Sequence, residues 1–244
     1  MKKIKPAYWF LLMVVAVFAW IFIPLISARL SIDGGVEQED LLARTPLSYI
    51  ELNGTKRKVP PFAFYNQDSL LITDQDLLGR VYVIDFFFTS CPTICPVMSS
   101  NLKTVHDTFG DELVSIVSIS IDPQNDTPEV LKAYAERYGV TDTDWHFLNG
   151  PQAEVYQLAN EGFNIFAAQL PDAPGGFEHA GLFALVDVQG YLRSRNDDFG
   201  NPIIYYRGFI AEDAPVDEFG ETSQLIPLIQ DIKKLLKENS WNNQ

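Results

Sequence analysis

The chain has two cysteines, Cys91 and Cys95, whose position favours chemistry over a structural cross-link. They follow an apolar, β-branched run at residues 81–88 and precede a segment with helical periodicity, so we expect them at a strand-to-helix turn. If this turn winds helically, residues i and i+4 project to the same side. Backbone N–H groups and the dipole at a helix N-terminus favour thiolates. Two thiolates together favour a soft ion such as Cu(I).

A plain disulfide is the simplest alternative use of this pair. It would close a loop of only a few residues and would constrain the unfolded chain little. Thioredoxin-type redox motifs place two residues between their cysteines, whereas three lie between Cys91 and Cys95. This spacing disfavours an ordinary oxidoreductase but leaves disulfide formation open. Structural zinc is disfavoured, because such sites usually take four ligands and the chain has no second cysteine pair.

His179 is the strongest candidate for a third metal ligand. It lies in the glycine-rich stretch 175–181, a predicted loop that enters an apolar strand at residues 182–186. In a thioredoxin-like sheet this loop faces the cysteine turn, so a neutral imidazole there completes a site with two sulfur ligands and one nitrogen ligand. Taken alone, a histidine in such a loop is more often a surface residue.

Four other residues near these segments have simpler explanations. His106 lies beside the apolar stripe of the predicted helix and is expected to be exposed, while His146 lies in a short predicted strand and is expected to be structural. Met98 is in register with core positions of the helix. Asp122 ends a predicted strand; it either supplies a carboxylate that supports the metal ligands or simply forms the strand-end turn.

Strand and helix patterns alternate along the chain, with a late hairpin. Apolar runs predict strands at residues 81–88, 113–121, 145–148, 181–188 and 191–193. Helical periodicity and helix-end signals predict helices from the second cysteine to residue 109, and at 128–138, 152–160 and 223–238. This order predicts an α/β, thioredoxin-like fold with a central mixed sheet flanked by helices. The role of residues 195–222 is open, although their aromatic side chains predict packed structure.

The N-terminus predicts a membrane anchor. Three lysines among the first five residues precede an uncharged apolar run at residues 7–26, which is long enough to cross a lipid bilayer as a helix. A cleaved signal peptide is the alternative. Lysines on the N-terminal side keep that end cytoplasmic, so the rest of the chain is expected on the exported, periplasmic side. The expected organisation is a tail and transmembrane signal anchor at 1–30, a linker at 31–59 and a metal-binding domain at 60–240.

The expected exported part is strongly acidic. Residues 1–30 contain four basic residues and no acidic ones, which leaves 14 basic and 32 acidic residues, a formal charge of −18, in the remainder. This charge argues against nucleic acid as a partner. It is compatible with attraction to a cation or a basic protein, although solubility alone would also explain it.

Two segments of the chain resemble the Sco/SenC family. They are residues 85–96 (DFFFTSCPTICP), and residues 118–123 (SISIDP) with the following 126–128 (DTP). The resemblance covers residues 60–240. It implies a thioredoxin-fold copper chaperone, not an enzyme in the strict sense, that helps to assemble the binuclear copper site of cytochrome c oxidase.

The resemblance also implies site residues and a partner. Cys91, Cys95 and His179 would bind Cu(I) or Cu(II), and Cys91 and Cys95 would form a redox-active disulfide. The implied partner is cytochrome c oxidase subunit II or another copper-accepting protein. Two departures from the family pattern stand out: Glu178 replaces an aspartate found in many relatives, and residues 195–222 are longer than the usual hairpin region.

Two further functions compete with copper delivery. The first is a membrane-anchored thiol-disulfide oxidoreductase that reduces the cysteines of a partner protein. The second is a peroxide-reducing enzyme, which needs a low-pKa cysteine beside a positioning group. Thr89 is the only adequate positioning group near the cysteines, so this function ranks last.

Overall fold

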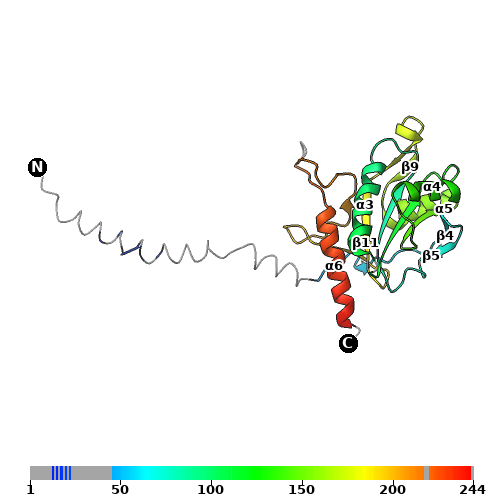
Figure 1. Cartoon of the computed structure of the whole chain (residues 1–244). Coiled ribbons are helices and arrows are strands. Elements are labelled where there is room, and N and C mark those ends of the chain that lie inside the picture. Colours follow the sequence, from blue (N-terminus) through cyan, green and yellow to red (C-terminus); the bar gives the residue numbers. More distant parts are fainter. Residues whose placement is uncertain are drawn as a thin grey trace, which may run out of the picture. The chain divides into compact units, whose positions relative to one another are not determined.

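The computed structural model (Figure 1) describes residues 46–110, 112–216 and 220–242, and a few single positions between 13 and 22. The chain divides into two compact units, Met1–Pro46 and Leu47–Gln244. Most of the predicted membrane span at residues 7–26 lies outside the described residues. Among the described residues, no helix is both long enough and apolar enough to cross a membrane.

Three parallel strands form the centre of the main sheet. β6 (Val81–Phe87) pairs in parallel with β7 (Val114–Ser120), which pairs in parallel with β8 (Trp145–Asn149). Every residue of β6 and β7 is buried. Sequences made mostly of β-branched and aromatic residues are expected of strands covered on both faces, and the sequence correctly placed these strands for that reason.

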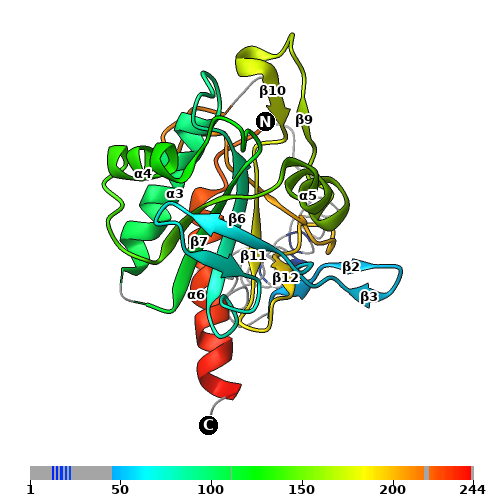
Figure 2. The same ribbon diagram turned by 90° about the vertical axis from the view of Figure 1, so that its right-hand side faces the viewer.

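Antiparallel strands extend this centre on both sides, so the predicted mixed sheet is confirmed (Figure 2). The order across the sheet is β1-β12-β11-β6-β7-β8-β4-β5, and β13 pairs with β11. The added strands are β1 (Ser48–Tyr49), β4 (Ala63–Asn66), β5 (Leu71–Thr73), β11 (Leu182–Val186), β12 (Leu192–Ser194) and β13 (Tyr206–Arg207). Two small hairpins stand outside it: β2 (Glu51–Leu52) with β3 (Thr55–Lys56), and β9 (Ala167–Gln169) with β10 (Phe177–His179).

Helices cover both faces of the sheet. They are α3 (Cys95–Phe109), α4 (Pro128–Arg137), α5 (Gln152–Gln157), the π-helix η1 (Leu158–Phe163) and α6 (Leu225–Asn242); η2 (Pro174–Gly176) is a short 3-10 turn. Adjacent strand residues point to opposite faces. Phe87 contacts Tyr134 of α4, whereas Phe86 contacts Phe163 of η1. The α5–η1 segment therefore lies on the face opposite α4, as Figure 2 also shows.

The packed unit begins earlier than the boundary expected near residue 60. Residues 47–59, assigned from the sequence to the linker, include β1, which pairs with β12, and the β2–β3 hairpin. Leu47, Ile50 and Val59 are buried. Arg193, itself buried, donates hydrogen bonds to the Leu47 carbonyl, Asp187 and Glu238. This segment looks polar in sequence because only scattered residues of it face the core.

Residues 195–222 are partly packed, as their aromatic side chains predicted. Tyr206 is fully buried, and its hydroxyl donates to the buried carboxylate of Asp231 in α6 at 2.7 Å. Tyr205 donates to the backbone carbonyl of Phe163 at the end of η1. Phe199, in contrast, is 90% exposed at a turn. The segment therefore ties α6 and η1 to the sheet.

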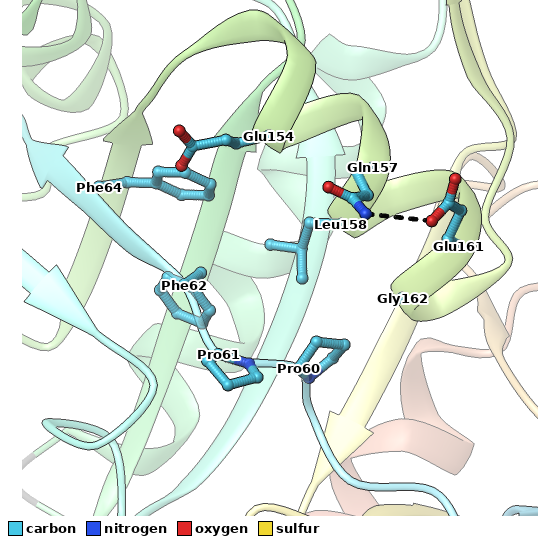
Figure 3. Close-up of a pocket in the computed structure, with 9 residues that line it drawn as sticks. All are labelled: Pro60, Pro61, Phe62, Phe64, Glu154, Gln157, Leu158, Glu161 and Gly162. Carbon is cyan, nitrogen blue, oxygen red and sulfur yellow. Dashed lines mark hydrogen bonds between the residues drawn. The ribbon is translucent and has the colours of Figure 1, made fainter.

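A groove of about 460 Å³ lies between the chain entering β4 and the α5–η1 segment (Figure 3). Its lining residues are Pro60, Pro61, Phe62, Phe64, Glu154, Gln157, Leu158, Glu161 and Gly162. A side chain at Gly162 would meet the Pro60 ring at 2.9 Å, so the glycine permits this close approach. None of the cysteine or histidine candidates lines the groove.

Candidate metal centre

The two cysteines lie where β6 leaves the sheet and α3 begins. The Cys91 N–H donates to the Phe88 carbonyl at 3.2 Å and closes a turn after β6. Cys95 is the first residue of α3, and Pro96 follows at a position that tolerates the missing N–H. Cys91 is 8% exposed and Cys95 is 1% exposed, and both are free thiols. The predicted strand-to-helix turn is confirmed.

His179 reaches this turn from the β9–β10 hairpin. The sequence placed it in a loop entering the next strand of the main sheet, but it is the last residue of β10 and pairs with Ala167 of β9. The hairpin packs on the cysteine turn, since the Phe177 ring lies 5.2 Å from the Phe88 ring. Strands of only three residues, AAQ and FEH, are too short to show a periodic pattern, which is why the sequence did not reveal the hairpin.

Cys91, Cys95 and His179 form a compact cluster. Their candidate ligand atoms all lie within 4.8 Å of one another, and it is the only group of three or more potential metal-binding side chains among the described residues. The Cys95 Sγ atom lies 3.1 Å from His179 Nε2. The Gly181 N–H points at Nδ1 at 3.4 Å, so Nε2 is the nitrogen that faces the sulfur atoms. Two sulfur donors and one imidazole suit a soft ion of low coordination number, such as Cu(I).

The two thiols shift each other's pKa in opposite directions. The neighbouring Cys95 thiol lowers the pKa of Cys91 well below its usual range, and His179 contributes to this shift. The pKa of Cys95 is raised, because its proton is shared with Cys91 and because it is buried. Deprotonation of the reduced pair is therefore favoured at Cys91 and disfavoured at Cys95.

A buried carboxylate, Asp85, lies in β6 below this turn. It accepts a hydrogen bond from the Ser118 hydroxyl at 2.5 Å, and that hydroxyl accepts from the Trp145 indole N–H at 3.0 Å. Burial raises the pKa of Asp85 to about 7, although the Ser118 bond acts in the opposite direction. The sequence shows Asp85 as the one charged residue of the 81–88 run, but it gives no sign of the buried bond to Ser118.

Asp122 follows the second of its two expected roles, the strand-end turn, since its carboxylate accepts both of its side-chain contacts from the Asn125 amide. Asp126, two residues before α4, is in the position of a helix-start residue. No side chain caps that helix, whose N-cap residue is Thr127. The Asp126 carboxylate instead bonds to Thr89 in the cysteine turn.

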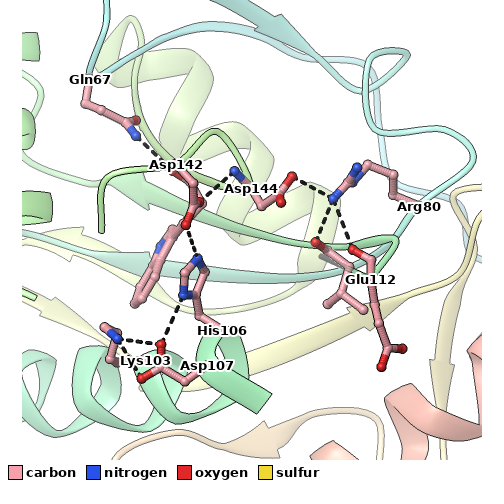
Figure 4. A network of polar contacts seen from close by, with 10 residues as sticks. Gln67, Arg80, Lys103, His106, Asp107, Glu112, Asp142 and Asp144 are labelled. Atoms are coloured by element: carbon pink, nitrogen blue, oxygen red, sulfur yellow. Dashed lines mark hydrogen bonds and ion pairs between the residues drawn. The ribbon is translucent and has the colours of Figure 1, made fainter. Parts of the chain in front are cut away.

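The remaining candidates lie outside the cluster. Met98 is fully buried in the core, as predicted. His106 was expected to be exposed, but its side chain is only 15% exposed and pairs with Asp142 at 2.9 Å (Figure 4), because residues 142–145 pack over the end of α3. Burial lowers the pKa of His146, so its imidazole is kept neutral in its strand. Neither of these histidines belongs to the metal-binding cluster.

The SCO1/SenC family model matches residues 50–207, a span that includes both cysteines and the histidine. The chain belongs to the SCO1/SenC family. The resemblance seen in the cysteine motif is therefore confirmed, and the family match extends to the segment before residue 60 that packs into the domain.

Individual relatives agree with this assignment. The chain is 33% identical over 150 residues to the SCO1 protein homolog of Bacillus subtilis, covering 60% of this chain and 73% of that protein. It is 29% identical to a putative copper-binding protein of Stutzerimonas stutzeri, covering 57% and 68% of the two chains. Its fold is similar to that of BsSco, described as a Sco-family cytochrome c oxidase assembly protein with a disulfide switch, with a TM-score of 0.60, 27% identity and coverage of 79% and 98%.

Proposed function

We propose that this protein is a copper chaperone that binds copper through Cys91, Cys95 and His179. The observation that carries the proposal is the convergence of these three side chains from the α3 N-terminus and the β9–β10 hairpin. The donor set suits Cu(I), because thiolates are soft ligands and the imidazole nitrogen faces them. A relative described as a copper-binding protein supports the same cargo.

Anaerobic titration of the reduced protein with Cu(I), in competition with a chromophoric chelator, tests this proposal. The wild type is expected to bind a single equivalent. His179→Ala should bind about tenfold more weakly, equivalent to about 1.4 kcal/mol, because two thiolates remain to hold the ion. His106→Ala is the matched control, since that histidine lies outside the cluster, and it should bind like the wild type. Equal binding by the wild type and Cys95→Ser would refute the copper site.

We propose cytochrome c oxidase subunit II as the acceptor of the copper. The support is the family membership, together with the description of BsSco as a cytochrome c oxidase assembly protein. Transfer of two equivalents of Cu(I) from the loaded protein to the soluble domain of subunit II, followed by one-electron oxidation with ferricyanide and absorbance of the mixed-valence binuclear centre, is the direct test. An acceptor that stays empty while the chaperone retains its copper would contradict this partner.

A thiol-disulfide oxidoreductase remains the second candidate, and one observation favours it. The low pKa of Cys91 and its greater exposure are properties of an attacking thiolate. In this function, Cys91 and Cys95 would cycle through a disulfide while reducing a partner's cysteines. His179→Ala would then retain its exchange rate with a disulfide substrate, while either cysteine variant would lose it.

We further propose that residues 7–26 anchor the protein in a membrane, with the metal-binding domain on the periplasmic side. The length and lack of charge of this run and the three preceding lysines support the proposal. Membrane fractionation of the full chain, and protease accessibility of residues 47–244 in spheroplasts, test the anchor and the side separately. Full release of the intact chain by alkaline carbonate would exclude the anchor.

A further inference from the structure

Asp126 is a buried carboxylate that connects the ends of β6 and β7. It has no exposed surface. One carboxylate oxygen accepts from the Thr89 backbone N–H at 3.1 Å and from the Ser120 hydroxyl, and the other accepts from the Thr89 hydroxyl. Both oxygens are therefore used, and two of the three bonds go to a single residue of the cysteine turn.

The donors around Asp126 are all neutral, and among the described residues no basic side chain forms an ion pair with it. Burial accordingly raises the pKa of Asp126, while the hydroxyl donors at Ser120 and Thr89 oppose this shift. Burying a carboxylate without a cationic partner contributes little to the stability of the fold. The carboxylate can still fix the positions of its neighbours, because it accepts several hydrogen bonds in defined directions.

The two cysteines depend on Asp126 to different extents. Cys95 is fixed by α3, which packs into the core through its own apolar stripe. Cys91 lies before the helix begins. Apart from its interactions with Cys95 and His179, it is held by its N–H bond to Phe88 and by a 3.6 Å approach of its sulfur to the Thr93 hydroxyl. The position of Cys91 therefore depends on the backbone of residues 88–90, in which Asp126, from the turn between β7 and α4, holds Thr89.

We propose that Asp126 is the positioning residue for Cys91: by holding both the amide and the hydroxyl of Thr89, it keeps the Cys91 sulfur within reach of Cys95 and His179. The expected effect on Cu(I) affinity rests on the proposed function. The expected effect on the geometry of the cysteine turn does not, because it is measured in the reduced, metal-free protein.

A matched pair of variants separates positioning from general stability. Thr89→Val and Ser120→Ala each remove one hydroxyl that donates to Asp126, but only Thr89→Val weakens the link to the cysteine turn. Thr89→Ser keeps the hydroxyl and serves as the rescue variant, and Asp126→Asn removes the charge with little change in volume. All four are to be made in the full chain and compared by thermal unfolding before further measurement.

The first measurement is amide hydrogen exchange at Cys91 in the reduced, metal-free protein. Exchange should be at least about tenfold faster in Thr89→Val and Asp126→Asn, and close to the wild type in Ser120→Ala and Thr89→Ser. The second is Cu(I) affinity by chelator competition. It should fall about tenfold in the same two variants, the size of effect that loss of a group supporting a metal ligand typically has.

Equal exchange and equal affinity in Thr89→Val and Ser120→Ala would overturn the positioning role, whatever their melting temperatures. If the wild type fails to bind Cu(I), the proposed copper function fails, and the exchange rates at Cys91 still decide whether Asp126 fixes the turn. If Thr89→Val does not fold, Thr89→Ser is compared with Asp126→Asn instead. Similar rates of amide hydrogen exchange at Cys91 in these two variants would likewise overturn the proposal.

Discussion

Asp85 by itself is expected to lower the free energy of unfolding by up to about 4 kcal/mol as the pH rises from 4 to 8, a contribution that the difference between the wild type and Asp85→Asn isolates. Its pKa is about 7 in the folded protein, against 3.8 for an unperturbed aspartate. Between these values the folded state holds a proton that the unfolded state has lost. Raising the pH therefore favours unfolding, and the effect is complete once the pH exceeds the folded pKa.

Asp85→Asn should remove this contribution, so that the stability of the variant relative to the wild type rises between pH 4 and pH 8. The amide is nearly isosteric and can still bond to the Ser118 hydroxyl. Urea unfolding of the wild type and the variant at several pH values between 4 and 8 measures the difference. Asp107→Asn is the control, because that exposed carboxylate pairs with Lys103 and its pKa is lowered instead. An equal change in stability between pH 4 and pH 8 in the wild type and in Asp85→Asn would contradict this assignment.

Gly175→Ala is expected to cost about 3 kcal/mol of stability and to weaken Cu(I) binding about tenfold, whereas Gly176→Ala costs about 1 kcal/mol and leaves binding unchanged. Both glycines have positive φ angles, of 81° and 84°, so an added side chain strains both backbones equally. A Cβ atom at Gly175 would lie 2.7 Å from the Phe88 ring, and one at Gly176 would meet nothing within 4 Å. Only the first substitution pushes the β9–β10 hairpin away from the cysteine turn.

The two glycine variants are compared by urea unfolding and by Cu(I) competition. Because the strain from the backbone angle is common to both, the difference between them isolates the contact with Phe88. That contact holds the hairpin that carries His179, whose ring lies 6.0 Å from the Phe88 ring. Identical copper affinities for Gly175→Ala and Gly176→Ala would show that the hairpin reaches the thiols without this close approach.

Local sequence was sufficient for the elements that carry the cysteines. The run at 81–88 is a buried strand because its side chains suit a sheet covered on both faces, and the stripe from Met98 to Phe109 is a helix because its apolar residues recur on one side. Cys91 and Cys95, four residues apart in the sequence, lie at the junction between this strand and this helix. These features depend on neighbours in the chain, so they can be read without knowing the fold.

Tertiary structure decided everything that depends on distant residues. His179 is 84 residues from Cys95 in sequence, and the hairpin that delivers it has too few apolar residues to be recognised by pattern. Asp126 reads as a helix start but bonds to Thr89, because the adjacent ends of two parallel strands bring them together. The sequence by itself therefore determined the pair of thiols and the strand–helix junction that presents them. Only the packing of separate strands determined what surrounds them, because hydrogen bonds between distant segments leave no periodic signal in the chain.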